Sequence, residues 1–371
     1  MANTITYKDA GVDYENLDPF KRAAQAAARK TSINLEKFHP GIAMLEESRG
    51  ESAPLFDVGD AYLTQVEEGL GTKNLVADAM QKLADCCYYG SIAIDTVAMI
   101  VNDMLTVGAL PVSLAMHAAV GDDAWFKDEG RTTALIEGWR RACDESLCAW
   151  GGGETPTLRG VVNPEAIVLS GSGVGFVRKD RVMLGSRIQA GDAILILTSS
   201  GIHANGLSLA RKIAERLPKG YLHRLPSGET FGRVLLRPTH IYARLIHEMQ
   251  QAGIECHYGV NITGHGWRKL MRANQLFCYV LDELPPVPEE FDLIQEAAKL
   301  PDREMYGTLN MGGGFALFLP HLAANQLIEL AATLKLSYKI IYAGRVEAAE
   351  QKRVVLVPKD IEYTTEDLQV R

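Results

Sequence analysis

The chain has 371 residues, of which 47% are apolar and 23% charged, and its formal net charge is −8. A chain of this length is expected to form two domains. The acidic balance, with no Lys/Arg-rich run, argues against a nucleic-acid-binding protein. No apolar stretch is long enough to span a bilayer and the start is polar, so neither a membrane span nor a signal peptide is expected.

The cysteines give no metal or redox motif. There are six, and none forms a C-x-x-C pair or a zinc-type spacing. We therefore expect reduced, mostly buried thiols in a cytoplasmic protein. They are Cys86, Cys87, Cys143, Cys148, Cys256 and Cys278.

Strand-like and helix-like segments alternate along the first half. The predicted helices are 18–30 (with Asp18 as its cap and Pro19 in its first turn), 92–107 and 132–150, and the predicted strands are 57–66, 114–119 and 166–177. The helix at 92–107 is predicted because Ile94, Val97 and Val101 recur at helical spacing. The helix at 132–150 is expected to end at the glycines 151–153.

The second half continues the alternation. The composition turns polar between 178 and 191, so we predict a domain boundary there, with an N-terminal domain at 1–178 and a C-terminal α/β domain at 179–371. The predicted strands there are 194–197, 315–319 and 338–343, and the predicted helices are 207–217, 239–252, 291–298 and 322–334. This order indicates an α/β (α+β) architecture.

The stretch from 193 to 212 is the most informative. An apolar run meets a Ser/Gly turn and then a helix, and the turn contains His203, Asn205 and Gly206. Free backbone N–H groups and the positive end of the helix dipole both favour an anion there. His203 adds a group that can contact phosphate or transfer a proton. An ordinary strand–turn–helix connection is the alternative.

A second glycine turn carries Glu68, Gly69, Gly71, Thr72 and Lys73. Two glycines permit close backbone approach to a ligand, and a lysine can neutralise phosphate. The spacing is not that of a Walker A loop or of the dinucleotide fingerprint. A plain hairpin turn is the alternative.

The helix at 92–107 carries three polar residues on an otherwise apolar background. Asp95 and Asn102 lie two turns apart on one face, with Asp103 beside them. Carboxylates at the edge of a buried face need partners, and Mg²⁺ with phosphate oxygens would supply them. Solvation near the helix end is the alternative for Asn102 and Asp103.

Two further glycine turns are candidates of the same kind. Gly152 and Gly153 precede the carboxylate of Glu154, which suits a metal or nucleotide ligand. Gly264 stands beside His265 in a Thr-Gly-His-Gly turn. An exposed loop acid and a structural histidine are the plain alternatives.

In chain order these motifs resemble one family. They lie at 7–13, 69–73, 94–103, 152–155, 199–206, 262–266 and 305–314. Together they are similar to phosphoribosylformylglycinamidine cyclo-ligases, also called aminoimidazole ribonucleotide synthetases. The resemblance implies a two-domain fold whose N-terminal domains pair into a β-barrel across a homodimer. It implies a small ribonucleotide substrate, with ATP and Mg²⁺ as cofactors and an ATP-driven ring closure in purine biosynthesis.

The resemblance also implies roles for the candidate residues. The metal ligands would be Glu68, Asp95, Asn102, Asp103 and Glu154. The ATP and phosphate contacts would be Gly69, Gly71, Thr72, Lys73, Gly152, Gly153, Asn205, Gly206 and Gly264. The catalytic residues would be His203 and Lys73.

The chain departs from the family pattern at several motif positions. Glu68 replaces the usual aspartate, Ile202 and Ala204 replace proline and serine, and His265 replaces a glycine. A paralogue on the same fold that phosphorylates another small molecule, or a nucleotide-binding homologue without turnover, is therefore the alternative function.

Overall fold

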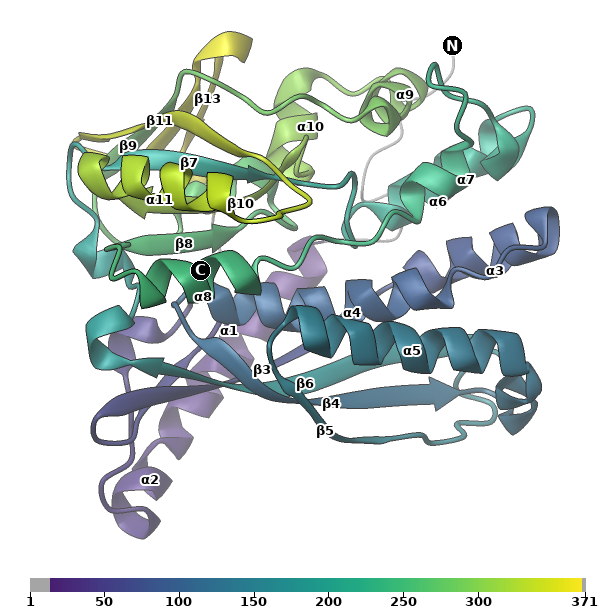
Figure 1. Cartoon of the computed structure of the whole chain (residues 1–371), viewed down its shortest axis with the longest axis horizontal. Helices are drawn as coiled ribbons and strands as arrows, with labels where there is room; N and C mark the ends of the chain where they lie inside the picture. Colours follow the sequence, from purple (N-terminus) through teal and green to yellow (C-terminus); the bar gives the residue numbers. More distant parts are fainter. Residues whose placement is uncertain (1–13, 369–371) are drawn as a thin grey trace.

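The first half of the chain forms a six-stranded sheet (Figure 1). The structure, a computed structural model, describes residues 14–368, so the motif at 7–13 lies outside it. The strand order is β1–β2–β3–β6–β4–β5, antiparallel except for the parallel pair β4 and β5. The strands are β1 (Ala43–Met44), β2 (Leu55–Asp57), β3 (Ala61–Gly69), β4 (Leu110–Val120), β5 (Ala149–Glu154) and β6 (Ile167–Arg178).

Helices pack on one face of this sheet (Figure 1). They are α3 (Lys73–Ala84), α4 (Tyr89–Leu105) and α5 (Glu129–Glu145). Nearly all of α4 is buried, which confirms the helix predicted from its apolar spacing. A Cβ atom at Gly138 of α5 would collide with the backbone of Gly90 on α4, so glycine is what allows the two helices to approach.

The second half forms a seven-stranded sheet in the order β13–β12–β9–β11–β7–β10–β8. Its strands are β7 (Ala193–Thr198), β8 (Tyr258–Asn261), β9 (Phe277–Leu281), β10 (Gly313–Leu319), β11 (Ile340–Ala348), β12 (Arg353–Leu356) and β13 (Ile361–Thr364). Its helices are α6 (Leu207–Arg216), α7 (Phe231–Leu235), α8 (Ala243–Gln251), α9 (Glu289–Ala298), α10 (Asp302–Thr308) and α11 (His321–Thr333). The two halves meet where α8 and β8 pack against α4.

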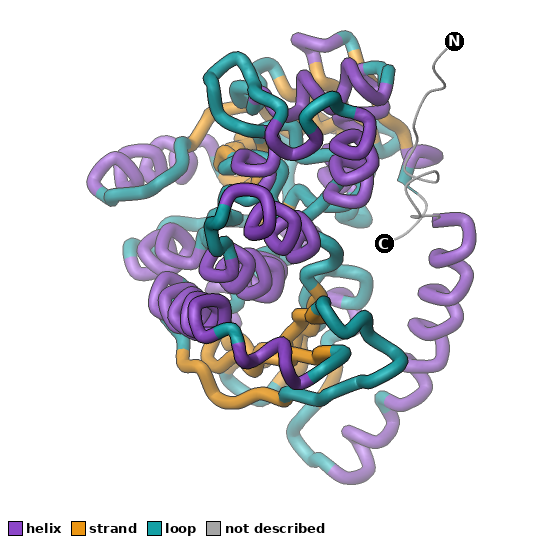
Figure 2. Tube along the Cα trace, turned by 90° about the vertical axis from the view of Figure 1, so that its right-hand side faces the viewer, coloured by secondary structure: helices purple, strands orange, loops and turns teal. Residues whose placement is uncertain are grey.

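The N-terminal segment stands apart from the helices that cover the sheets (Figure 2). It contains α1 (Tyr14–Thr31) and α2 (Ile33–Phe38). Because α1 begins at Tyr14, the prediction that Asp18 caps this helix is wrong. Short 3₁₀ segments complete the structure: η1 (Glu46–Ser48), η2 (Asp123–Lys127), η3 (Lys179–Arg181), η4 (Gly185–Arg187), η5 (Gly220–Leu222), η6 (Gly266–Met271), η7 (Val357–Lys359) and η8 (Thr365–Asp367).

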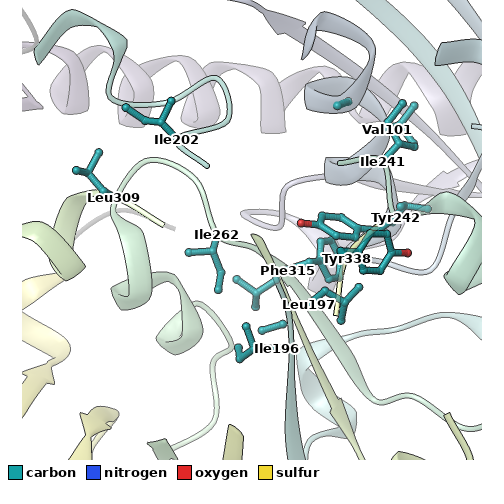
Figure 3. Close-up of a cluster of buried hydrophobic side chains, with 14 of the residues drawn as sticks. Val101, Ile196, Leu197, Ile202, Ile241, Tyr242, Ile262, Leu309, Phe315 and Tyr338 are labelled. Carbon is teal, nitrogen blue, oxygen red and sulfur yellow. The ribbon is translucent and has the colours of Figure 1, made fainter. Parts of the chain in front are cut away.

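A buried aromatic cluster supports the loop that follows β7 (Figure 3). The ring centroids of Tyr242 and Tyr338 lie 4.8 Å apart, and Phe315 packs 5.6 Å from Tyr242. The Tyr242 hydroxyl donates a 3.0 Å hydrogen bond to the carbonyl of Thr198 at the end of β7. The last strand residue before the 199–206 turn is thus held by packing and by a satisfied polar contact.

Two sequence predictions need correction. The predicted helix at 132–150 ends at Glu145, and the glycines 151–153 lie in strand β5 rather than in a loop. A Cβ atom at Gly151 or Gly153 would collide with atoms of β4, so these glycines serve the close pairing of two strands. The strand predicted at 57–66 is found for the most part as β3, and the possible break at Gly59 is the turn between β2 and β3.

The mixed arrangement of strands and helices confirms the predicted α/β (α+β) class. All six cysteines are free thiols. No helix between residues 14 and 368 is both long enough and apolar enough to cross a membrane.

Candidate active site

A pocket of about 920 Å³ opens between the two halves of the chain. Its walls come from α1, the segment before β2, the end of β3, α4 and two loops of the second half. The side chains that line it toward the two sheets belong to Glu68, Met99, Asp103, Asn205, Asn261, Thr263, His265, Lys269 and Arg272. Helix α1 adds basic residues, among them Lys21 and Arg22.

The first half of the chain contributes two carboxylates to the pocket, those of Glu68 and Asp103. Glu68 ends β3 beside Gly69, and Asp103 lies in the last turn of α4. Burial and the nearby charge of Asp103 raise the pKa of Glu68 to about 7, although Lys269 opposes the shift. The negative charge of Asp103 disfavours the ionised form of Glu68, and a cation bound by both carboxylates would relieve this repulsion. A perturbed carboxylate in a cleft is also the usual mark of a functional site.

The donor set fits Mg²⁺ bound together with phosphate. Mg²⁺ usually takes one or two protein carboxylates and completes its octahedron with water and substrate oxygens. Glu68 and Asp103 supply two carboxylates on one pocket. Within the described part of the chain, no group of three or more His, Cys, Asp or Glu side chains forms a ready-made metal cage. The missing ligands would therefore have to come from water and from the phosphates themselves.

The second half contributes amides and a glycine turn. Asn205 precedes α6, and Asn261 ends β8. The Asn261 side-chain amide donates a 2.8 Å hydrogen bond to Asp103, which ties the second half to the carboxylate of the first. Gly264 lies in the loop between β8 and η6, next to His265, whose φ of 69° is the left-handed conformation. Burial and the surrounding Lys and Arg charges lower the pKa of His265 to about 4.

Lys73 and Asp95 do not line this pocket. Both side chains are fully buried, and the Lys73 ammonium lies 2.8 Å from the Asp95 carboxylate. Lys73 also donates to the carbonyls of His203 at 2.9 Å and Arg237 at 2.8 Å, so its three N–H donors all have acceptors. Asp95 accepts from the backbone and hydroxyl of Thr239. This group, here called the interdomain ion pair, joins α3 and α4 to two loops of the second half.

His203 contacts the interdomain ion pair through its backbone carbonyl, which accepts from Lys73. It has a left-handed φ of 59°, and its Nε2 accepts a 3.2 Å hydrogen bond from the backbone N–H of Ser200. Burial, the neighbouring His240 and Lys73 together lower its pKa well below the ordinary value. The His203 ring is therefore neutral, and its hydrogen bond with Ser200 stabilises the turn in which both residues lie.

Asn102 is another interdomain contact. Its amide donates to the carbonyl of His240 at 2.9 Å and accepts from the backbone N–H of Tyr242 at 3.2 Å. Both hydrogen-bonding ends of this buried side chain are used by the second half.

The remaining candidates lie in the first sheet, in the turn after β3 and in the turn before α6. Gly69, Gly71 and Thr72 form the turn from β3 into α3, and Gly206 precedes α6. Gly152, Gly153 and Glu154 lie exposed on the edge strand β5. The structure thus brings together Glu68, Asp103, Asn205 and Gly264 at the pocket, and it places Lys73, Asp95, Asn102 and His203 in buried contacts between the two halves.

Lys269, Arg272 and the basic residues of α1 were not among the predicted site residues. Lys269 is buried, and its ammonium donates to the carbonyl of Asn261 at 3.1 Å and to the hydroxyl of Thr263. Burial and Arg272 lower its pKa to about 8, against the opposing charges of Asp103 and Glu68. The signal in the sequence is a run of three cations, Arg268, Lys269 and Arg272, directly after a glycine turn.

Known proteins with similar sequences cover almost the whole chain. The family model "AIR synthase related protein, N-terminal domain" matches residues 55–177, and the corresponding C-terminal model matches 189–357. A phosphoribosylformylglycinamidine cyclo-ligase of Methanocaldococcus jannaschii is 35% identical over 344 residues, 92% of each chain. One from Carboxydothermus hydrogenoformans is 32% identical over 95% of this chain and 98% of its own.

Solved structures share the fold at much lower identity. One chain of the HypE–HypF complex superposes with a TM-score of 0.60 at 15% identity, covering 90% of this chain and 97% of that one. AaThiL complexed with AMPPCP and TMP superposes with a TM-score of 0.57 at 17% identity, covering 82% and 87%. The predicted two-domain fold is thus confirmed, and the chain belongs to the AIR synthase family.

Proposed function

We propose that this protein is an ATP-dependent phosphoribosylformylglycinamidine cyclo-ligase that acts in purine biosynthesis. The observation that carries the proposal is the interdomain pocket, where Glu68, Asp103, Asn205 and Gly264 meet from four separate motifs. The names of relatives that are 32–35% identical over most of the chain support the same reaction.

ATP would bind with its phosphates toward Glu68 and Asp103. Structural neighbours complexed with AMPPCP or with ATP support nucleotide binding by this fold. Mg²⁺ held by these two carboxylates would neutralise the charge of the phosphates. Asn205 and the backbone at Gly264 would contact the phosphate oxygens from the opposite wall.

The proposed reaction turns a poor leaving group into a good one. The amide oxygen of formylglycinamidine ribonucleotide attacks the γ-phosphorus of ATP, the bond from that phosphorus to ADP breaks, and an imidoyl phosphate forms. The amidine nitrogen then attacks the activated carbon, the carbon–oxygen bond breaks, and phosphate leaves as the nitrogen loses a proton. Aminoimidazole ribonucleotide, ADP and phosphate result. Phosphoryl transfer of this kind depends on positioning and charge stabilisation more than on covalent help.

In this proposal the interdomain ion pair positions the site. Lys73 and Asp95 hold the loops that carry His203 and Arg237 against α3 and α4, and Asn102 does the same for His240. A direct role of His203 in proton or phosphoryl transfer would require its turn to rearrange, since its ring is buried in this structure.

The protein would act as a homodimer in the cytoplasm. The face of the first sheet opposite α4 carries apolar side chains of β6 that are each more than a third exposed, namely Val168, Val174 and Phe176. An apolar sheet face of this kind favours burial against a second copy.

The test is turnover by the purified protein with ATP, Mg²⁺ and formylglycinamidine ribonucleotide, with ADP and aminoimidazole ribonucleotide followed together. The proposal predicts equal amounts of both products. ADP release that depends on a different acceptor would instead indicate the paralogue, and nucleotide binding without any ADP would indicate a homologue that has lost turnover.

A further inference from the structure

The two buried lysines near the site differ in how their ammonium groups are used. Lys73, in the motif that resembles a phosphate-binding turn, has three acceptors inside the protein and lines no part of the pocket. Lys269 lines the pocket while only 6% of it is exposed. A protein-bound lysine offers three N–H donors, so the acceptors around each one decide whether it can also bind a ligand.

Lys269 has acceptors for two of its donors. They are the backbone carbonyl of Asn261, at 3.1 Å, and the hydroxyl of Thr263. The described residues offer it no third acceptor. A buried cation with an unused donor on a cavity wall costs free energy unless an anionic partner binds there. The two contacts it does make fix the ammonium at the β8 end of the pocket.

The charges around Lys269 locate it beside the proposed metal site. The carboxylates of Asp103 and Glu68, from the first half of the chain, both act on it electrostatically, and so do the cations Arg272 and Lys21. Asn261 links the two groups, because its carbonyl accepts from Lys269 while its amide donates to Asp103. An anion that enters between the carboxylate-bound cation and Lys269 would be stabilised from both sides.

We propose that Lys269 is the residue that binds the transferred phosphoryl group, the role that the sequence motif suggests for Lys73. This inference rests on the proposed function only for the identity of the molecule that accepts the phosphoryl group. The binding of the phosphoryl group by Lys269 does not depend on that identity. As the phosphorus leaves ADP and bonds to the amide oxygen, charge spreads over its three equatorial oxygens. The third donor of Lys269 would stabilise that charge more strongly than it stabilises bound ATP.

The test compares Lys269→Met and Lys269→Arg with the wild-type protein. We expect Lys269→Met to lower kcat at least ~100-fold with a KM for ATP within a few-fold of wild type, as for the loss of one transition-state donor. Lys269→Arg keeps the cation and should recover at least ~10-fold of that loss. Arg268→Met is the matched control, since Arg268 instead contacts the carbonyls of His265 and Asp367. Its kcat should stay close to that of wild type.

A binding measurement separates this role from a structural one and does not need the ribonucleotide. Lys269→Gln keeps a donor for the Asn261 carbonyl and removes the charge. It should weaken binding of ADP with aluminium fluoride and Mg²⁺, which mimics the transferring phosphoryl group, at least ~30-fold more than binding of AMPPCP. Equal weakening of both ligands, or no weakening of either, would overturn the proposal. If wild-type protein fails to convert formylglycinamidine ribonucleotide, the proposed function fails while this comparison still decides the role of Lys269.

Discussion

The ammonium of Lys73 and the carboxylate of Asp95 lie 2.8 Å apart with no exposure to solvent, and the loops around them come from the other half of the chain. A buried ion pair is stable only when its remaining donors and acceptors are satisfied. Here the carbonyls of His203 and Arg237 satisfy the remaining donors of Lys73, and Thr239 donates to Oδ1 of Asp95, while Oδ2 of Asp95 has only the ion pair with Lys73. The pair therefore joins one half of the molecule to the other.

Replacing Lys73 should destabilise the protein strongly. Lys73→Met leaves Asp95 as a buried charge without its partner, and we expect the free energy of unfolding to fall by about 3–5 kcal/mol. Urea unfolding followed by circular dichroism measures the loss. The control is Lys82→Met, which removes the ion pair with Glu165 on the surface and should cause no measurable change. Equal effects of the two substitutions would contradict the structural role of the interdomain ion pair.

At position 68, activity should depend more on the negative charge of the side chain than on its length. Glu68→Asp keeps the carboxylate and should retain kcat within about 10-fold of wild type, whereas Glu68→Gln should lower kcat at least ~100-fold because a cation ligand is lost. Steady-state turnover at several Mg²⁺ concentrations makes the comparison. Full activity of Glu68→Gln would exclude Glu68 from the metal site.

Stability should fall on mild acidification, partly through His240. Burial lowers the pKa of His240 to about 4, below the ordinary value of 6.5. Between these two values the unfolded chain binds a proton that the folded chain does not, so stability decreases as the pH falls from 6.5 toward 4. The contribution of His240 is up to about 3 kcal/mol. His240→Gln should therefore show a shallower loss of unfolding free energy than wild type in that window, and an unchanged slope would contradict the assignment.

A charge on the outer face of the first sheet should disrupt the homodimer. Phe176→Glu places a carboxylate in the apolar face that also contains Val168 and Val174. Sedimentation velocity should then show a monomer where the wild-type protein is a dimer. Leu322→Glu alters an exposed apolar residue on α11 and should leave the dimer intact. A wild-type monomer, or a dimer that survives Phe176→Glu, would exclude this interface.

The sequence predicted elements well where the pattern is local. The strand and helix that flank the 199–206 turn are found as β7 and α6, because apolar runs and helical spacing are properties of neighbouring residues. The glycines 151–153 were misplaced for the opposite reason. Their strand depends on the close approach of β4, a contact between segments far apart in the chain.

The same distinction applies to the site. Glu68 and Asp103 could be predicted to share a site because their residue types and the family motifs favour a metal and phosphate. The different positions of the two lysines could not be predicted in this way. Lys73 points into the protein and Lys269 lines the pocket, because the packing of the two halves decides which lysine is surrounded by acceptors. Burial of this kind depends on tertiary contacts that no single motif contains.

The most direct test is aminoimidazole ribonucleotide formation by wild-type protein and by Asp103→Asn, measured side by side with ADP release. The account predicts equal amounts of both products from the wild-type protein. It predicts a fall in kcat of at least ~100-fold in Asp103→Asn, which keeps the size of the side chain but removes the carboxylate beside Glu68. Undiminished ring closure by Asp103→Asn would show that the chemistry takes place elsewhere than in the pocket between the two sheets.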